Sequence, residues 1–428
     1  MNKKLIFVHI LAICILFGQH SFKVSYSYYN PFSENEKSSK LSNLENKGNG
    51  IYTELSMDFG NFKYYNEMCA SQSEYQMRRG GGKKVFGLFG FSNQGYIKFN
   101  KKVLNQYHEI LFGRAYIDHG HGISGRLLIS KWSRPFDQIA WKMEYKELTG
   151  SMYVIQLNTM NHFKRFLAIH NLTYQISKNI QLSLGESILY AGEKRGLEFQ
   201  YINPTLLWIP IRENNPLSER GNSIIYSGIK IKNKKMDIWY EFILDDYQID
   251  KEIKEPATYG IITGLSIKNL LKTLENFSLE YTRIPNRTYQ TQGEFGQENY
   301  IHRNFPIGHY FGNDFDKTFI SMDFLNFKIK DFEISPMLNL SYLRDGNEGI
   351  QTEWDSPWIN DQNYKESFLT PPVSYIFESE LTARIKFNRS TFFEIGIFSK
   401  REETLNVEKL NHSLFCRYNF TVGNKFNY

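Results

Sequence analysis

The tract from Arg195 to Arg220 carries side chains suited to sugar recognition. Flat aromatic faces pack against the C–H surfaces of sugars, and carboxylates, amides and guanidinium groups beside them bond the hydroxyls. The aromatic residues here are Phe199, Tyr201 and Trp208, and the polar ones are Arg195, Glu198, Asn203, Arg212 and Glu213. From these we select Arg195, Glu198, Tyr201, Asn203, Trp208 and Arg212 as candidate glycan-binding residues. The alternative is a structural loop whose charges pair with the elements around it.

Two other stretches contain groups that bind metals. Asp245, Asp246 and Asp250 could supply oxygen ligands to calcium, but the Gly and terminal Glu of an EF-hand loop are missing. His119 and His121 could coordinate zinc with a third ligand from elsewhere. Acidic turns at strand ends and a Gly-rich turn explain these stretches without an ion. We therefore predict no metal site and no cofactor.

The sequence offers possible Ser–His catalytic pairs, but none of them is a specific signal for an enzyme. His170 and Ser183 or Ser187 would lie on neighbouring strands, a conceivable arrangement for a hydrolase. The sequence has no nucleophile elbow beside them, and many strands offer chance pairs. We predict a protein that is not an enzyme and keep an outer-membrane hydrolase as an alternative.

The elements that must position these residues are β-strands. Phe377, Ser379, Leu381, Ala383, Ile385 and Phe387 interleave with Glu378, Glu380, Thr382, Arg384 and Lys386. Side chains alternate between the two faces of a strand, so this segment has one apolar and one charged face. A charged row would be costly in a dry core and suits a polar lumen, with the apolar row facing lipid. The chain is 41% hydrophobic and 16% aromatic, which suits a transmembrane barrel with aromatic girdles.

We predict an all-β transmembrane antiparallel β-barrel of about eighteen strands over residues 51–428. Candidate strands are 51–59, 85–91, 95–101, 107–116, 122–130, 137–147, 150–158, 164–174, 180–190, 223–232, 236–244, 258–267, 277–284, 317–327, 332–343, 372–387, 391–400 and 412–422. Long irregular tracts at 191–222, 285–316 and 345–372 should lie at one end of the barrel and short turns at the other. Long tracts that fold inward would plug the lumen.

The N-terminus predicts export to the bacterial outer membrane. Lys3 and Lys4 precede an apolar run to Phe17, which has the length of a signal peptide and is too short to span a bilayer. We assign 1–21 to the signal and 22–50 to a polar lead-in. Removing the two lysines lowers the net charge from +6 to +4, a surplus that could favour anionic glycans. Whether Cys69 and Cys416 pair is left open.

Glu186 breaks the alternation of its segment. Ile180, Leu182 and Leu184 would face lipid, and Glu186 has the same parity. A carboxylate there is costly, so we expect either a rim position or a bulge near Gly185 that turns Glu186 inward. We favour the bulge, with Glu186 in a structural ion pair with a loop residue such as Arg195.

Several stretches together resemble the capsule assembly (Wzi-type) outer-membrane family. They are 167–174, 180–193, 197–204, 240–250 with Asp245 and Asp246, 280–285 with Arg283, and 306–314 with His309. Their order and spacing match the family over roughly residues 107–345. After the signal no periodic helical segment follows, so a helical bundle at the N-terminus is not expected.

The resemblance implies an eighteen-stranded barrel, closed by inward loops, that acts as a lectin for capsular or related surface polysaccharide. Glu186, Asp245, Asp246, Arg283 and His309 would then be structural or lumen residues. The expected partners are that polysaccharide, outer-membrane lipids and the barrel-assembly machinery, with no nucleic acid. The alternative from another class is a general porin with an open lumen.

Overall fold

A computed structural model describes residues 19–29, 48–72, 84–85, 87–214, 221–246, 255–292, 296–361, 363–387, 391–405 and 407–426. Within these ranges no helix has the length and hydropathy needed to cross a bilayer. Residues 1–18 of the expected signal peptide lie outside the described residues. The expected polar lead-in lies outside them from residue 30 to residue 47. Asp250 also lies outside them.

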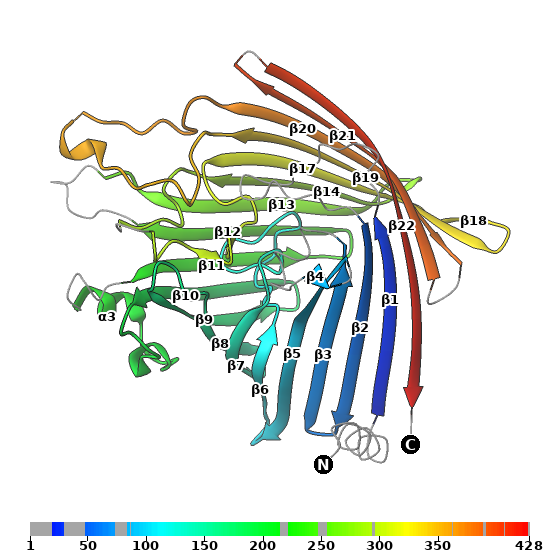
Figure 1. The fold of residues 1–428 in the computed structure, drawn as a ribbon, viewed down its shortest axis with the longest axis horizontal. Helices are drawn as coiled ribbons and strands as arrows, with labels where there is room; N and C mark the ends of the chain where they lie inside the picture. Colours follow the sequence, from blue (N-terminus) through cyan, green and yellow to red (C-terminus); the bar gives the residue numbers. More distant parts are fainter. Residues whose placement is uncertain are drawn as a thin grey trace.

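Eighteen strands form a closed antiparallel ring, as the sequence predicts. Each pairs with the next, and β22 pairs with β1, where His20 lies opposite Phe426. Figure 1 shows these two strands side by side. The strands are β1 (Gln19–Tyr29), β2 (Gly48–Phe59), β3 (Phe62–Ser71), β5 (Leu88–Val103), β6 (Gln106–Ala115), β7 (Phe136–Tyr145), β8 (Leu148–Gln156), β9 (Lys164–Ser177), β10 (Ile180–Gly192), β11 (Asn222–Lys232), β12 (Met236–Asp246), β13 (Thr258–Leu271), β14 (Leu274–Ile284), β17 (Phe315–Phe324), β19 (Phe332–Asp345), β20 (Ser374–Lys386), β21 (Thr391–Thr404) and β22 (Val407–Phe426).

Short elements occupy the connections between these strands. They are β4 (Lys84–Val85), β15 (Ile301–His302), β16 (Phe305–Pro306), β18 (Phe327–Ile329), the 3-10 turns η1 (Phe199–Tyr201) and η3 (Pro357–Ile359), and the helix α3 (Trp208–Asn214). Short turns lie at the barrel end that holds Gln19 and Phe426. One example is Leu104-Asn105, where both residues have positive φ, as tight hairpins require. The long connections 116–135, 193–221, 285–314 and 346–373 lie at the other end.

The outer face of the wall is apolar. On β20, Tyr375, Phe377 and Leu381 are exposed, while Arg384 points inward and pairs with Glu394 of β21 at 2.9 Å. The charged row of this strand therefore faces the lumen, as its alternation predicts.

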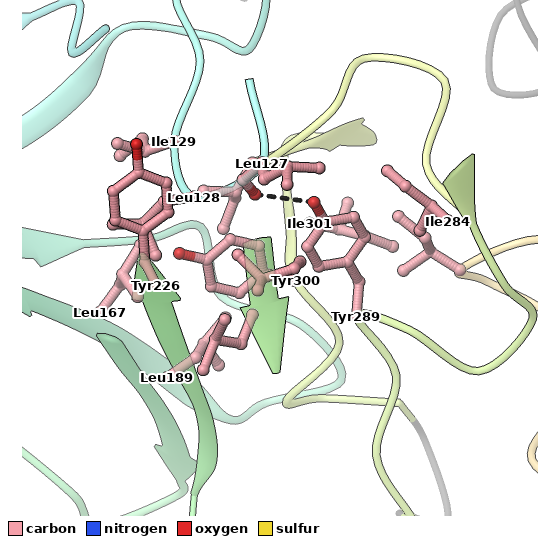
Figure 2. Packing of buried hydrophobic residues seen from close by; sticks show 14 of the residues in the cluster. Leu127, Leu128, Ile129, Leu167, Leu189, Tyr226, Ile284, Tyr289, Tyr300 and Ile301 are labelled. Atoms are coloured by element: carbon pink, nitrogen blue, oxygen red, sulfur yellow. Dashed lines mark hydrogen bonds between the residues drawn. The ribbon is translucent and has the colours of Figure 1, made fainter. Parts of the chain in front are cut away.

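Two inward loops fill the lumen with an apolar core. Leu127, Leu128 and Ile129 of loop 116–135 pack against Tyr289 and Tyr300 of loop 285–314, and all five are fully buried. Figure 2 shows Tyr289 donating a hydrogen bond to the Leu127 carbonyl, at 2.7 Å. The wall supplies inward apolar residues at this level, including Leu167, Leu189 and Tyr226 (Figure 2). The lumen therefore has a buried apolar core where the loops enter it, because the loops cover the inward residues of the wall.

The structure corrects several strand assignments. β1 and β3 were not expected as strands, and residues 22–29 of the expected lead-in lie in β1. Segments 85–91 and 95–101 belong mainly to one strand, β5, in which a bulge at Asn93 interrupts the alternation. Segment 122–130 is not a strand; its apolar run is core of the inward loop. Two strands are missing from the prediction and two are counted in excess, so the predicted total of eighteen is still correct.

Cys69 lies on β3 and is buried as a free thiol. Cys69 and Cys416 therefore do not pair, because the Cys69 thiol forms no disulfide.

Candidate functional site

Two wall carboxylates hold loop 116–135 inside the barrel. Glu241 of β12 accepts hydrogen bonds from the backbone N–H groups of His121, Gly122 (2.7 Å) and Leu127 (3.4 Å). Figure 1 shows this cyan loop lying across β11 and β12. Glu241 has no exposed surface, and hydrogen bonds to a charged group contribute about 1.5–3 kcal/mol each. Glu241 therefore fixes the middle of the loop.

Glu280 of β14 binds the adjacent part of the same loop. It accepts from the Ile123 N–H at 2.6 Å, and from the Ser124 N–H and hydroxyl at 2.8 and 2.6 Å. The indole of Trp239 donates to Oε2, the oxygen that also accepts from Ile123, at 2.9 Å. Glu280 has no exposed surface, so these donors replace its hydration.

Loop 285–314 is held by Arg165, from a neighbouring part of the wall. This inward guanidinium on β9 donates to the carbonyls of Gln297 (2.5 Å), Asn299 (2.7 Å) and Ile301 (2.9 Å). Asp245 of β12 accepts from the Tyr289 N–H at 2.5 Å. Asp245 is thus a lumen residue that fastens a loop.

The remaining lumen candidates do not all lie in the lumen: His309 is inside the barrel, whereas Arg283 has the parity opposite to the buried, inward Glu280 and Thr282 of its strand. His309 is fully buried and its ring packs against Phe315 at 4.8 Å between centroids. Arg283 lies at the rim with its guanidinium 3.6 Å from the centroid of Phe368. Asp246 lies at the end of β12, where it pairs with Thr258. Among the residues described, no three His, Cys, Asp or Glu side chains are arranged to hold a metal.

The six predicted glycan residues do lie together, but on the outside of the barrel. On β9 and β10, Arg165 and Ser187 contact the inward loops, the latter through the Tyr300 hydroxyl at 3.3 Å. Side chains of the other parity point outward, and among them Leu172 and Leu184 are about half exposed. His170 and Glu186 share this outward parity, and they are the residues that α3 covers.

Glu186 anchors α3 to this outer face. Its carboxylate accepts from the N–H groups of Trp208 (2.8 Å) and Ile209 (2.6 Å) in the first turn of the helix, and from His170 Nε2 at 3.1 Å. The Trp208 ring stacks on His170 with centroids 4.0 Å apart. The first N–H groups of a helix have no partner within it, so the carboxylate supplies one.

The expected bulge at Gly185 and the expected ion pair with Arg195 are therefore wrong. Pairing with β9 is regular across this point, with Gly185 opposite Asn171 and Glu186 opposite His170. Glu186 keeps its outward parity, and the cost of a carboxylate there is avoided because α3 covers it. Arg195 instead pairs with Glu198 at 2.7 Å and lies over the Tyr190 ring.

Burial changes the chemistry available to the predicted glycan residues. Tyr201 and Trp208 have no exposed surface, so neither ring has a face open to a sugar. Asn203 bonds the N–H and hydroxyl of Thr205 at 3.0 and 2.7 Å, and Arg212 donates to Ser223 at 3.0 Å. This tract is built as a cover for the wall, which is the structural alternative given above.

A polar cleft opens instead at the barrel end that carries the long loops. Its volume is about 470 Å³, within the range of about 300–1,000 Å³ typical of ligand pockets. The half-buried ring of Phe311 is part of its lining. The lining also includes carboxylates and amides, namely Asp345, Asn347, Glu348 and Gln351. Sequence reasoning did not select these residues, because they are scattered through a loop without aromatic clustering.

Two buried side chains shape the backbone around this cleft. Asp314 accepts from the N–H groups of Glu348 (3.0 Å) and Thr370 (3.1 Å), and Gln290 donates to the carbonyls of Gly349 (2.9 Å) and Thr352 (3.1 Å). Gly346 is required at its position, because a Cβ there would lie 2.1 Å from the Asp314 carboxylate. The cleft is therefore preorganised, which lowers the entropic cost of binding.

An arginine orders the outer part of the same loop. Arg287 lies 5.0 and 4.8 Å from the ring centroids of Trp354 and Trp358. It also pairs with Asp355 at 2.5 Å and with Glu366 at 2.9 Å. Its side chain is almost fully buried, so these partners compensate its desolvation.

Replacing Arg287 by methionine should expose this loop to protease. Methionine keeps much of the volume but loses the cation–π contacts and both ion pairs, leaving Glu366 half-buried without its cation. We expect trypsin to cleave after Lys365, which is exposed, at least about tenfold faster than in the parent, as a loss of about 1.4 kcal/mol of local stability requires. The matched control is Arg384→Met, which breaks an ion pair inside the barrel. Equal cleavage rates in the two variants would contradict the assigned role.

No protein-family model and no curated protein match the sequence. Among solved structures, Wzi of Escherichia coli aligns with a TM-score of 0.64 at 12% identity, over 98% of this chain and 88% of that one. It is described as an outer membrane protein involved in group 1 capsule assembly and as a carbohydrate-binding β-barrel. This chain has the fold of the Wzi barrel.

The Wzi-like fold agrees with the resemblance seen in the sequence. Pseudomonas aeruginosa OprD also aligns, with a TM-score of 0.50 and 10% identity over 96% of each chain. Both similarities concern the fold of outer-membrane barrels, and at these identities they assign no ligand. The site must therefore be argued from this chain's own residues.

Proposed function

We propose that this protein is a non-enzymatic outer-membrane barrel that binds a surface polysaccharide and anchors it at the cell surface. The observation that carries the proposal is the filled lumen. Two loops are fastened inside by Glu241, Glu280 and Arg165, and their apolar residues are fully buried. Such a barrel is suited to binding at its loop end and poorly suited to conduction. The Wzi-like fold supports the same proposal.

The cleft at the loop end is the proposed glycan site. Phe311 offers an aromatic surface, and Asn347 and Gln351 are exposed amides able to bond sugar hydroxyls. The held backbone at Gly349 and Thr352 keeps these groups in place. This location replaces the 195–212 tract as the proposed site. Export by the N-terminal signal, contact with outer-membrane lipids and assembly by the barrel-assembly machinery belong to the same proposal.

Replacing Asn347 and Gln351 together by alanine should weaken retention of surface polysaccharide. Each lost hydrogen bond is worth about 0.5–1.5 kcal/mol, so together they should reduce affinity about tenfold. The measurement is binding of the purified protein to polysaccharide from its own cells, with surface staining of cells that carry each variant. Barrel assembly should be unchanged, because both side chains are exposed.

The control is Glu198→Ala, which alters the outer tract and leaves the cleft intact. The proposed site is wrong if the cleft variant binds like the parent, and in particular if only Glu198→Ala loses binding. Single-channel conductance addresses the porin alternative. The proposal expects almost no current from the parent, whereas a porin would conduct in steps.

A further inference from the structure

A second cavity lies on the outer surface, between the α3 segment and the wall. It has a volume of about 740 Å³. Its wall side is formed by outward residues of β7 to β11, including Trp141, Gly150, Leu172 and Leu184. Its other side is formed by the loop before α3 and the first turn of the helix, residues 204–210. We call this cavity the outer groove.

The outer groove is apolar and is continuous with the lipid-facing wall. Leu172, Leu184 and Ile225 are each about half exposed and lie on the outward face. Leu207, on the loop side, is 70% exposed. The carboxylate and the imidazole at the groove, Glu186 and His170, are already bonded to each other and to α3.

The loop that forms the groove also exposes apolar side chains away from the wall. Phe199 is 87% exposed and Leu197 is 50% exposed. Large exposed apolar patches mark sites of contact with lipid or protein. Because this patch adjoins the lipid face at the loop end of the barrel, it is suited to lie in the outer leaflet of the membrane.

We infer that the outer groove holds a hydrocarbon acyl chain of a membrane lipid, inserted between α3 and the wall. An acyl chain satisfies the apolar lining, needs no hydrogen bonds, and reaches the groove laterally from the leaflet. The inference rests on the membrane location in the proposed function, and it is independent of the glycan cleft. Glu186 and His170 hold the cover in place through their bonds to each other and to the first turn of α3.

Gly150 offers a direct test, because it leaves the groove floor open. A Cβ at this position would meet no atom within 4 Å, so phenylalanine can be accommodated and would fill the groove. Aromatic residues are also favoured in strands, so Gly150→Phe should fold. The matched control is Leu381→Phe, which adds a ring on the outward face of β20, far from the groove.

The experiment titrates dibrominated stearate into the full-length protein in detergent and follows tryptophan fluorescence. Bromine quenches an indole on contact, and Trp141 lines the groove. We expect saturable quenching in the parent and in Leu381→Phe. In Gly150→Phe the apparent affinity should fall at least about tenfold, as expected when about two methylene groups lose their burial. Leu207→Gln, which makes the loop side polar, should lower it in the same direction. Trp141→Phe should remove most of the saturable signal.

Quenching that never saturates, or that is identical in the parent and Gly150→Phe, would overturn the inference, because it would reflect general partitioning onto the barrel. A saturable signal that survives in Trp141→Phe would equally overturn it. Polysaccharide binding, measured on the same samples, should be unchanged in Gly150→Phe. The quenching assay therefore tests the acyl-chain inference, and the polysaccharide assay tests the proposed function independently of it.

Discussion

Replacing Glu241 and Glu280 together by alanine should turn a closed barrel into a conducting one. These two carboxylates bind five backbone N–H groups of loop 116–135. Each such bond to a charged group contributes about 1.5–3 kcal/mol. Water can hydrate the freed N–H groups only if the loop moves away from the wall. The loop should therefore leave the lumen.

Planar-bilayer recording measures this effect. We expect almost no current from the parent and stable single-channel steps from the double variant, with each single variant intermediate. The matched control is Glu109→Ala, because Glu109 lies on the inner wall and pairs with Lys98 of the neighbouring strand at 2.9 Å. Currents as small in the double variant as in the parent would show that the apolar core alone retains the loop.

Acidification should release the same loop through its histidines. Burial lowers the pKa of His119 and of His121 to about 4, from 6.5. The inserted loop therefore disfavours protonation, whereas a released loop takes up protons at ordinary pH. Insertion is fully favoured above pH 6.5 and loses stability as the pH falls towards 4. One pKa unit corresponds to about 1.36 kcal/mol, so the two groups together have a large effect.

Glu298 acts in the opposite direction on the other loop. Burial raises the pKa of Glu298 to about 7, so its contribution to stability is present below its ordinary value of 4.5 and is lost as the pH rises through 7. Burial lowers the pKa of His302 and of His309 in the same loop well below 6.5, so acid also weakens the insertion of loop 285–314. Replacing only the two histidines of loop 116–135 therefore measures the part of the acid response that belongs to that loop.

The measurement is conductance as the pH is lowered from about 7 to about 4. We expect channels to open in the parent, and to open at a lower pH in a variant with His119→Asn and His121→Asn. The parent and the variant differ only at these two imidazoles, so the shift between their opening curves measures the contribution of the imidazoles. Identical opening curves would exclude the histidines as the cause.

The sequence and the structure differ most where loops meet the wall. The alternation in β20 predicted the correct outward face, because side-chain direction in a strand depends only on parity. The apolar run at Leu127 to Ile129 looked like a strand, because a buried loop core has the same composition as a buried strand. The bulge at Asn93 made one strand look like two.

The candidate site shows the same limit. The aromatic and charged residues of the 195–212 tract predicted a glycan site there, and these residues do lie together. The role of these side chains depends on whether the loop folds into the lumen or over the outer wall, and no local sequence pattern distinguishes the two. Glu186 marked the place, since a carboxylate of lipid-facing parity requires a cover, and that cover is α3.

The sequence by itself determined a β-barrel with an apolar outer face, a charged row within, and long loops at one end. These follow from parity and turn composition, which act between neighbours along the chain. Only the tertiary structure decided that two loops fill the lumen, that a third covers the outer wall, and that a polar cleft forms beside Phe311. Those outcomes depend on contacts such as Glu280 to Ser124, between residues 156 positions apart.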